Sequence, residues 1–338
     1  MTRFTRRTFI VAMAALLPLA TVQAAEISER TIKFAFQNNK GHPQEMGAQK
    51  FAELVGAKSG GKIKVKLFPG GQLGGDVQTI SAVQGGTIEM SVLNSGILQS
   101  LSREFAVFDF PFLFANPAEA DAVTDGAFGR GLHAKLAEKN LIGLGFWDLG
   151  FRNITNSKHP ITKVEDIAGL KLRVIQSPIY VDMFSALGAN PTPLAWPEVY
   201  SALEQKAVDG QENPNTTIRS AKLNEVQKHL AQTRHVYNPQ SLIFSKKLWD
   251  KLSADEKKII ADAATEATAY ERQVSRQQAS EAIEELKKSG MQVTEIAPAE
   301  LQRMRDKVKP VIDKYSAQVG PDTVKALYAE IAKVRGGK

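Results

Sequence analysis

The chain has 338 residues, of which 43% are hydrophobic, so it is long enough for two domains and has the apolar content of a globular protein. It contains no cysteine, which excludes disulfides, cysteine-ligated metals, thiolate nucleophiles and a lipoprotein anchor. The formal net charge is +7, and it falls to +4 without the first 24 residues, which carry three arginines and no acid. The remainder has no long basic run, so we expect no nucleic-acid partner.

Residues 1–24 have the pattern of a cleaved export signal. Three arginines precede an apolar run from Phe9 to Ala20, which is too short to span a bilayer. Small residues around Ala24 fit the cleavage site. The pair Arg6–Arg7 leaves the general secretory and the twin-arginine routes both open. Either route leads out of a bacterial cytoplasm, so we expect a periplasmic protein.

The next segment alternates between strand and helix patterns. Alternating apolar residues predict strands at 31–37 and 63–67, and a third strand is predicted at 88–93. Helices are predicted from Pro43 and from Asp76. This order predicts a parallel sheet covered by helices. The glycine-rich loop 70–75 lacks the ending of a P-loop, and we interpret it as a structural turn.

The middle of the chain is predicted to contain short elements. The phenylalanine-rich segment 104–114 is interpreted as core, because phenylalanine is mostly buried. Two prolines in the strand pattern at 190–194 indicate an edge strand. The other predicted elements are a helical stretch to 139, a strand at 141–147, helices at 178–187, 196–204 and 218–230, a strand at 208–213 and an extended segment at 235–244.

The last third is predicted to be mainly helical. Ser253 and Glu256 have capping-box spacing, and no glycine or proline follows until after residue 288. This predicts either one helix of about 50 Å or two helices with an unmarked break. A strand is predicted at 291–295, and then helices to the end, with breaks at Pro310 and Gly320.

Two arginines stand on strand-like runs in the middle of the chain. Arg152 follows Gly150-Phe, and Arg173 lies in Leu170–Val174, directly before a helix that Pro178 would open. Ligands of open α/β sheets bind beyond the carboxyl ends of strands, and a guanidinium matches a carboxylate bidentately. Both arginines are therefore candidates for carboxylate binding. The alternative is a surface arginine or one end of a structural ion pair.

The sequence has no catalytic pattern. The five histidines are scattered without metal-ligand spacing, and no Gly-x-Ser-x-Gly motif occurs. The adjacent Glu165 and Asp166 are interpreted as solvent-facing residues of a short helix with a capping box from Thr162 to Glu165. We therefore expect no enzyme, no cofactor and no metal site, with a secreted enzyme on a two-domain α/β fold as the alternative.

Four segments resemble, in chain order, the DctP-type solute-binding proteins of TRAP (tripartite ATP-independent periplasmic) transporters. They are Pro69–Asp76, Gly169–Pro178, Leu187–Glu204 and Val208–Pro214. The resemblance implies an α/β, two-domain periplasmic-binding-protein fold (type II-like), with a ligand cleft between the domains and a long helix bridging both. The implied division is 25–149 with 239–278 for domain I, and 150–238 with 279–338 for domain II.

The resemblance also implies a monomer that captures a small organic acid and delivers it to TRAP transporter membrane subunits. Arg173 matches the arginine that clamps the ligand carboxylate in this family, Arg152 resembles the second cleft arginine, and Asn213 matches the asparagine of the Gly-Gln-Glu-Asn block. The other candidate ligand-binding residues lie near predicted strand ends or in the cleft-forming segments: Gln37, Asn38, His42, Asp76, Asn94, Trp196 and Gln211.

The polar candidates favour a hydroxylated acid, such as a uronate or an aldonate, because several of them could bind hydroxyl groups. A C4-dicarboxylate or a keto acid is the alternative, since Arg152 could take a second carboxylate. Asp76 would oppose a second negative charge if it lines the cleft.

Overall fold

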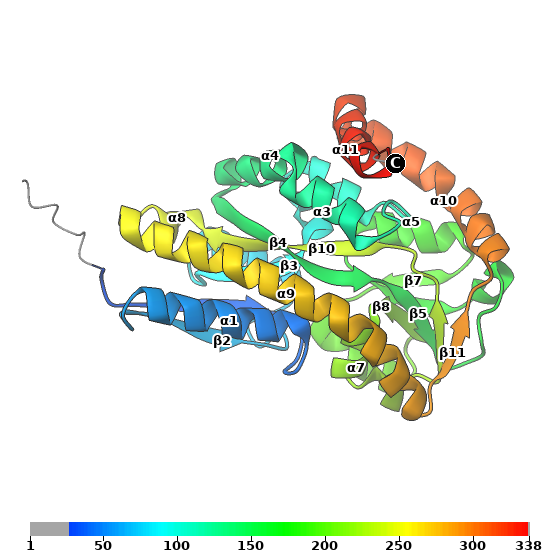
Figure 1. The fold of residues 1–338 in the computed structure, drawn as a ribbon. Coiled ribbons are helices and arrows are strands. Elements are labelled where there is room, and N and C mark those ends of the chain that lie inside the picture. The colour runs from blue at the N-terminus through cyan, green and yellow to red at the C-terminus, as the bar shows by residue number, and fades with distance from the viewer. Residues whose placement is uncertain (1–26, 337–338) are drawn as a thin grey trace, which may run out of the picture.

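The computed structural model describes residues 27–336 as two mixed sheets with helices packed on their faces (Figure 1). The predicted signal peptide lies outside these residues. Within them, no helix combines the length and the apolar content that crossing a membrane requires.

The first sheet has the strand order β2-β1-β3-β10-β4. Its strands are β1 (Arg30–Phe36), β2 (Ile63–Phe68), β3 (Met90–Asn94), β4 (Leu141–Phe151) and β10 (Tyr237–Ser245). The first three strands are parallel to one another, as the sequence predicted. β10 runs antiparallel between β3 and β4, so the complete sheet is mixed.

The second sheet has the order β11-β9-β5-β8-β6-β7. Its strands are β5 (Asn153–Asn156), β6 (Lys171–Val174), β7 (Asn190–Pro193), β8 (Gly210–Asn213), β9 (His229–Gln232) and β11 (Gln292–Glu295). The proline-containing β7 is an edge strand, as predicted, because proline has no backbone N–H to donate to a neighbouring strand. Arg152 is the single residue between β4 and β5, where the chain passes from one sheet to the other.

Helices cover both sheets. The α-helices are α1 (Pro43–Lys58), α2 (Asp76–Gly85), α3 (Pro117–Asp125), α4 (Ala127–Lys135), α5 (Pro178–Ala186), α6 (Val199–Glu204), α7 (Asn215–Ser220), α8 (Lys246–Trp249), α9 (Ala254–Lys288), α10 (Pro298–Val319) and α11 (Pro321–Arg335). Short 3-10 helices occur at η1 (Ser95–Ser100), η2 (Arg103–Asp109), η3 (Leu136–Lys139), η4 (Val164–Ile167), η5 (Trp196–Glu198) and η6 (Leu223–Glu225).

The phenylalanine-rich segment is core, as predicted. Phe105, Phe108, Phe110 and Phe114 are buried, and only Phe112 is half-buried. A second apolar cluster fills the space between the first sheet, α1 and α9, where the rings of Phe34 and Trp147 meet edge to face at 5.9 Å.

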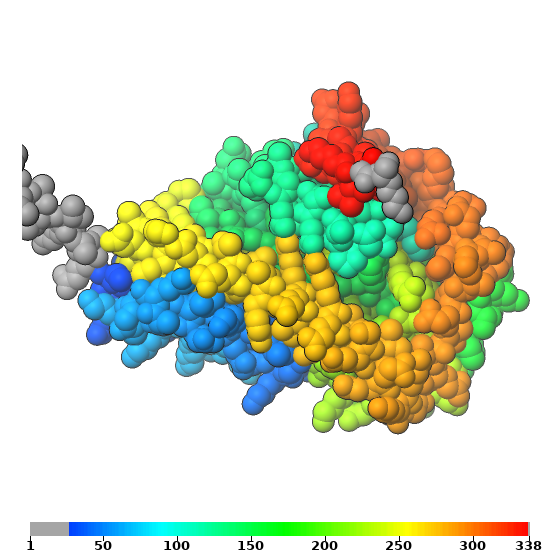
Figure 2. Space-filling view, viewed as in Figure 1, coloured from blue at the N-terminus to red at the C-terminus, as the bar shows by residue number. Residues whose placement is uncertain are grey.

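The long helix is continuous, which resolves the alternative that the sequence left open. α9 has 35 residues and begins with the predicted capping box: Ser253 Oγ accepts from the Glu256 amide at 3.2 Å, and Glu256 accepts from the Ser253 amide at 2.8 Å. It packs on α1 and β4 of the first half, and on α7 and β11 of the second. Figure 2 shows it lying across the surface beside α1.

Three local predictions were wrong. The helix predicted at 218–230 ends after Ser220, because Lys222 takes a left-handed conformation and residues 229–232 pair as β9. α10 continues through Pro310, which lies on its exposed face, so the carbonyl that loses its partner remains available to water. At η4 the cap is Asp166, which accepts from the amides of Thr162 and Lys163, whereas Glu165 pairs with Arg303.

The predicted domain division remains a prediction. The contacts of the C-terminal helix do not follow it. α11 belongs to the segment assigned to domain II, but it packs on α3 of the other half. Arg335 forms an ion pair with the buried Glu119 at 2.7 Å across this contact. The C-terminal helices therefore join the two halves, as α9 does.

The capping box gives a stability test. We expect Ser253→Ala to lower the free energy of unfolding by about 1 kcal/mol, because the amide of Glu256 loses its acceptor. Urea unfolding followed by circular dichroism measures the change. Ser280→Ala, an exposed serine inside the same helix, is the control and should leave stability unchanged within about 0.5 kcal/mol. Equal effects of the two substitutions would contradict a role for the cap.

Candidate functional site

A small cavity between the two sheets brings together most of the predicted site residues. Eight of the ten line it: Gln37, Asn38, Asp76, Asn94, Arg152, Arg173, Trp196 and Asn213. Its empty volume is about 350 Å³. Asn94 ends β3 of the first sheet and Asn213 ends β8 of the second, so strand ends from both halves meet here, as open α/β sheets favour.

Arg173 is buried and has no acidic partner. Its side chain leaves β6 and is only 4% exposed, and its Nε and one terminal nitrogen donate to the Leu194 carbonyl at 3.0 and 2.7 Å. The guanidinium lies 5.8 Å from the ring centre of Trp196. No carboxylate among residues 27–336 forms an ion pair with it. Burial lowers the pKa of Arg173 to about 10, so the group is charged at neutral pH.

A buried charge without a counter-ion is unfavourable, and a bound group of opposite charge offsets this cost. The Arg173 side chain lines the cavity and has a terminal nitrogen that does not bind Leu194. A carboxylate is the group that matches a guanidinium in charge and in planar geometry. The arrangement can therefore bind one small carboxylate.

Arg152 also lines the cavity, but its charge is already balanced. It is fully buried and forms a bidentate ion pair with Glu212, one arm of which measures 2.7 Å. A further nitrogen donates to Asn238 at 3.0 Å. Burial alone would raise the pKa of Glu212, but Arg152 and His235 hold it below its ordinary value. Arg152 thus matches the structural ion pair that the sequence left as the alternative.

Three polar oxygens in the wall of the cavity receive no hydrogen bond from any of the residues 27–336. They are Gln37 Oε1, Asp76 Oδ1 and Asn94 Oδ1, all buried. Burial raises the pKa of Asp76 to about 7, although Arg173 and Arg152 act to lower it. Unsatisfied buried acceptors are costly, so a bound molecule that supplies hydroxyl donors would be favoured.

His42 and Gln211 do not line the cavity, and their predicted contact with ligand is not supported by this geometry. His42 caps α1 through Nδ1, and its Nε2 lies 3.1 Å from Thr217 Oγ1. Burial lowers the pKa of His42 to about 3, so it is neutral. Gln211 donates to Thr155 at 2.9 Å and accepts from Asn213 at 2.6 Å. Both side chains stand behind the lining and orient residues that form it.

Four lining residues were missed by the sequence analysis: Leu149, Ile175, Thr217 and Gln240. Gln240 had a usable signal, because it is a polar residue in a strand that is buried throughout, and it pairs with Asn94 across β3 and β10. Thr217 had a weaker sequence signal: it is a polar residue four positions after the candidate Asn213. Leu149 and Ile175 have no polar chemistry that could have distinguished them from core.

The two halves touch at the rim of the cavity. The loop 70–75 approaches η5 so closely that a Cβ on Gly71, whose φ is +69°, would lie 2.7 Å from Pro197 Cγ. On another side, Ser177 Oγ donates to Asp109 at 2.8 Å and lies 2.9 Å from the amide nitrogen of Gln99. The structure is therefore closed around the cavity. The described residues contain no cluster of three or more side chains that could hold a metal ion.

Two α/β halves closed over a buried arginine that lacks a counter-ion define the class of two-domain ligand-binding proteins. Residues 34–318 match the family described as bacterial extracellular solute-binding protein, family 7 (DctP), and the chain belongs to this family. Its members are solute-binding proteins of transporters, and the predicted recognition and fold class are thereby confirmed.

Solved structures and a curated relative agree with this assignment. A TRAP periplasmic solute-binding protein from Ochrobactrum anthropi is 57% identical, with a TM-score of 0.81 over 93% of this chain and 98% of its own. The sugar-acid-binding protein DctPAm of Advenella mimigardefordensis, solved with galactonate, is 43% identical, with a TM-score of 0.89 over 91% and 99%. The 2,3-diketo-L-gulonate-binding periplasmic protein YiaO of Escherichia coli is 35% identical over 81% of this chain and 84% of its own.

The buried ion pair gives the second stability test. We expect Glu212→Gln to destabilise the protein by about 3–5 kcal/mol, because it leaves the charge of Arg152 buried without a counter-ion. Chemical denaturation measures the loss. The control, Glu165→Gln, breaks a half-exposed pair with Arg303 and should cost less than about 1 kcal/mol. A loss below about 1 kcal/mol for Glu212→Gln would refute the structural role assigned to the pair.

Proposed function

We propose that this protein captures a small hydroxylated monocarboxylate, a sugar acid such as an aldonate or a uronate, in the periplasm. It delivers the acid, unchanged, to the membrane subunits of a TRAP transporter, and it acts as a monomer after removal of residues 1–24. The observation that carries the proposal is the buried guanidinium of Arg173, which lacks an acidic partner and faces a closed cavity.

The charges around the cavity favour one carboxylate over two. Glu212 neutralises Arg152, so only Arg173 offers a positive charge that is not balanced by a bonded carboxylate. A second carboxylate would also meet Asp76, whose own ionised form is disfavoured by burial. A C4-dicarboxylate is therefore the weaker candidate for this cavity.

The orphan oxygens of Gln37, Asp76 and Asn94 favour hydroxyl groups on the ligand, because hydroxyls can donate to all three. Galactonate and 2,3-diketo-L-gulonate, the ligands named for two relatives, each carry one carboxylate on a chain with several further oxygens. An apolar keto acid would leave these acceptors unsatisfied.

Binding would be coupled to closure of the two halves. The carboxylate binds Arg173 of the second half, while its hydroxyls bind Gln37 and Asn94 of the first. A ligand that contacts both halves only when they are closed stabilises the closed form by its differential affinity. The closed form then presents one composite surface to the membrane subunits.

Arg173 supplies the direct test of the proposal. We expect Arg173→Ala to weaken sugar-acid binding at least 100-fold, because two charge-assisted hydrogen bonds are each worth about 1.5–3 kcal/mol. Arg173→Lys should also bind weakly, since lysine lacks the planar fork. A thermal-shift screen of aldonates, uronates, C4-dicarboxylates and keto acids identifies the ligand, and calorimetry then measures its affinity.

Arg303→Ala, which removes a surface arginine, is the matched control and should bind normally. Retained affinity in Arg173→Ala would refute the clamp. A larger stabilisation by succinate than by any sugar acid would refute the hydroxylated monocarboxylate.

Asp76 predicts a pH dependence. In this closed structure burial raises the pKa of Asp76 to about 7, so both closure and a bound carboxylate nearby should raise the pKa above that of the open protein. Binding should therefore take up a proton near pH 7, and the affinity should rise as the pH falls from 8 to 6. Calorimetry in buffers of different ionisation enthalpy measures the proton uptake. Asp76→Asn should abolish it, and an unchanged uptake in that variant would exclude Asp76 as its source.

A further inference from the structure

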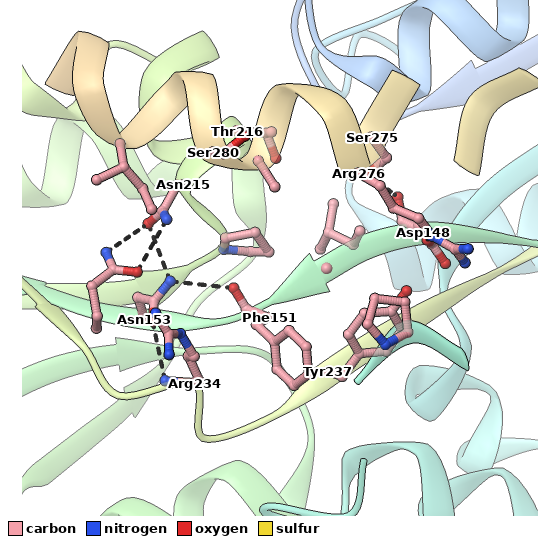
Figure 3. Close-up of a pocket in the computed structure, with 17 residues that line it drawn as sticks. Asp148, Phe151, Asn153, Asn215, Thr216, Arg234, Tyr237, Ser275, Arg276 and Ser280 are labelled. Carbon is pink, nitrogen blue, oxygen red and sulfur yellow. Dashed lines mark hydrogen bonds and ion pairs between the residues drawn. The ribbon is translucent and has the colours of Figure 1, made fainter. Parts of the chain in front are cut away.

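A second cavity lies behind the segments that connect the two halves, on the side of α9 (Figure 3). Its empty volume, which includes space open to the solvent, is about 800 Å³, against about 350 Å³ for the cleft. We call it the hinge cavity. α9 crosses one side of it, and the junction of β4 and β5 crosses the other (Figure 3).

One layer of backbone separates the hinge cavity from the cleft. Leu149 of β4 lines both cavities. Beyond it the chain alternates: Arg152 lines the cleft, whereas its neighbours Phe151 and Asn153 line the hinge cavity. Successive side chains of an extended segment point to opposite sides, so this segment has one face in each cavity.

The turn from β8 to α7, within the second half, repeats this arrangement. Asn213 and Thr217 line the cleft, while Pro214, Asn215 and Thr216 between them line the hinge cavity. The crossing from β4 to β5 and the turn from β8 to α7 are therefore shared walls of the two cavities. A change in their backbone alters the two cavities together.

The hinge cavity contains hydrogen-bonding capacity that the protein does not use. Thr216 is 1% exposed, and its hydroxyl has no partner among the described residues. Asn215 donates to Gln232 at 3.1 Å, and Gln232 donates back at 3.1 Å, which uses one N–H of each amide and leaves the other. A ligand oxygen would satisfy these groups.

The rest of the lining is mainly apolar and has no unpaired charge. Arg276 pairs with Asp148 and Asp121 at 2.7 and 2.6 Å, and Arg234 pairs with Glu295 at 3.5 Å. The apolar surface comes from the hinge and from α9: Leu149, Phe151, Pro214, Tyr237, Ala279 and Ile283. Because each cation has an acidic partner, the cavity offers an anion no net attraction.

We propose that the hinge cavity is a second binding site, which takes an uncharged molecule with an apolar ring and a hydroxyl or carbonyl oxygen. Its occupancy raises the affinity of the cleft for its acid. The hinge cavity is open in the same conformation in which the cleft is closed, and its walls come from both halves and from α9. A molecule that fits this conformation favours closure, and the coupling is reciprocal.

Benzyl alcohol is the probe for this site. We expect saturation-transfer NMR and calorimetry to show binding to the full mature protein in the millimolar range, with benzoate and benzylamine at least tenfold weaker. Ala279→Phe should abolish binding, because the new ring occupies the cavity from the exposed side of α9. Ala326→Phe, at an exposed position of α11, is the matched control and should bind normally. No binding by the unaltered protein, or equal binding by Ala279→Phe, would overturn the site.

The coupling is tested separately, and this arm rests on the proposed function. Saturating benzyl alcohol should tighten sugar-acid binding at least threefold in the unaltered protein and not in Ala279→Phe. An unchanged acid affinity would overturn the coupling. Arg173→Ala should still bind benzyl alcohol although it loses the acid, so failure of the cleft proposal and failure of the hinge site give different results.

Discussion

The ion pair between Arg152 and Glu212 is the interaction on which the rest of this structure depends. Arg152 is the one residue between the two sheets, and Glu212 lies in β8 of the second sheet. His235 and Asn238, on the return segment into the first sheet, bind the same two side chains. A fully buried pair that loses one partner costs several kcal/mol, so this cluster fixes the geometry of the crossing.

Under the proposed function, the same pair also limits the charge of the ligand that the cleft can bind. Two arginines line the cavity, and without Glu212 they would form a dication suited to two carboxylates. With Glu212 in place, Arg173 alone keeps an unbalanced charge, and Asp76 stands in the same wall. Under the proposed function, the preference for one carboxylate therefore follows from Glu212, which does not line the cleft. The charge of the cleft is known only when the buried partners of its lining residues are counted with it.

Much of the fold could be predicted from periodicity, and the candidate cleft residues came from the family resemblance. The parallel strands, the edge strand β7 and the cap of α9 depend on local patterns, which the sequence carries directly. The sequence could not predict that Arg152 has an acidic partner and that Arg173 has none. Both arginines lie on strand-like runs, and only the folded chain brings Glu212 to Arg152. The contacts of His42 could not be predicted for the same reason, since its ring caps α1 and lies beside Thr217 only in the folded chain.

The segments that cross between the two sheets are also where the protein would bend when the two halves move apart. A hinge must change its backbone angles, yet here it carries a buried ion pair and forms a wall of two cavities. The rigid cluster at Arg152 limits where bending can occur, and Gly150, at a φ of +106°, stands two residues before it with a conformation that glycine adopts readily. On the proposed coupling, opening of the cleft moves residues 149–151 against α9. The space behind the hinge then permits that movement, and a molecule that fills it shifts the equilibrium toward the closed protein.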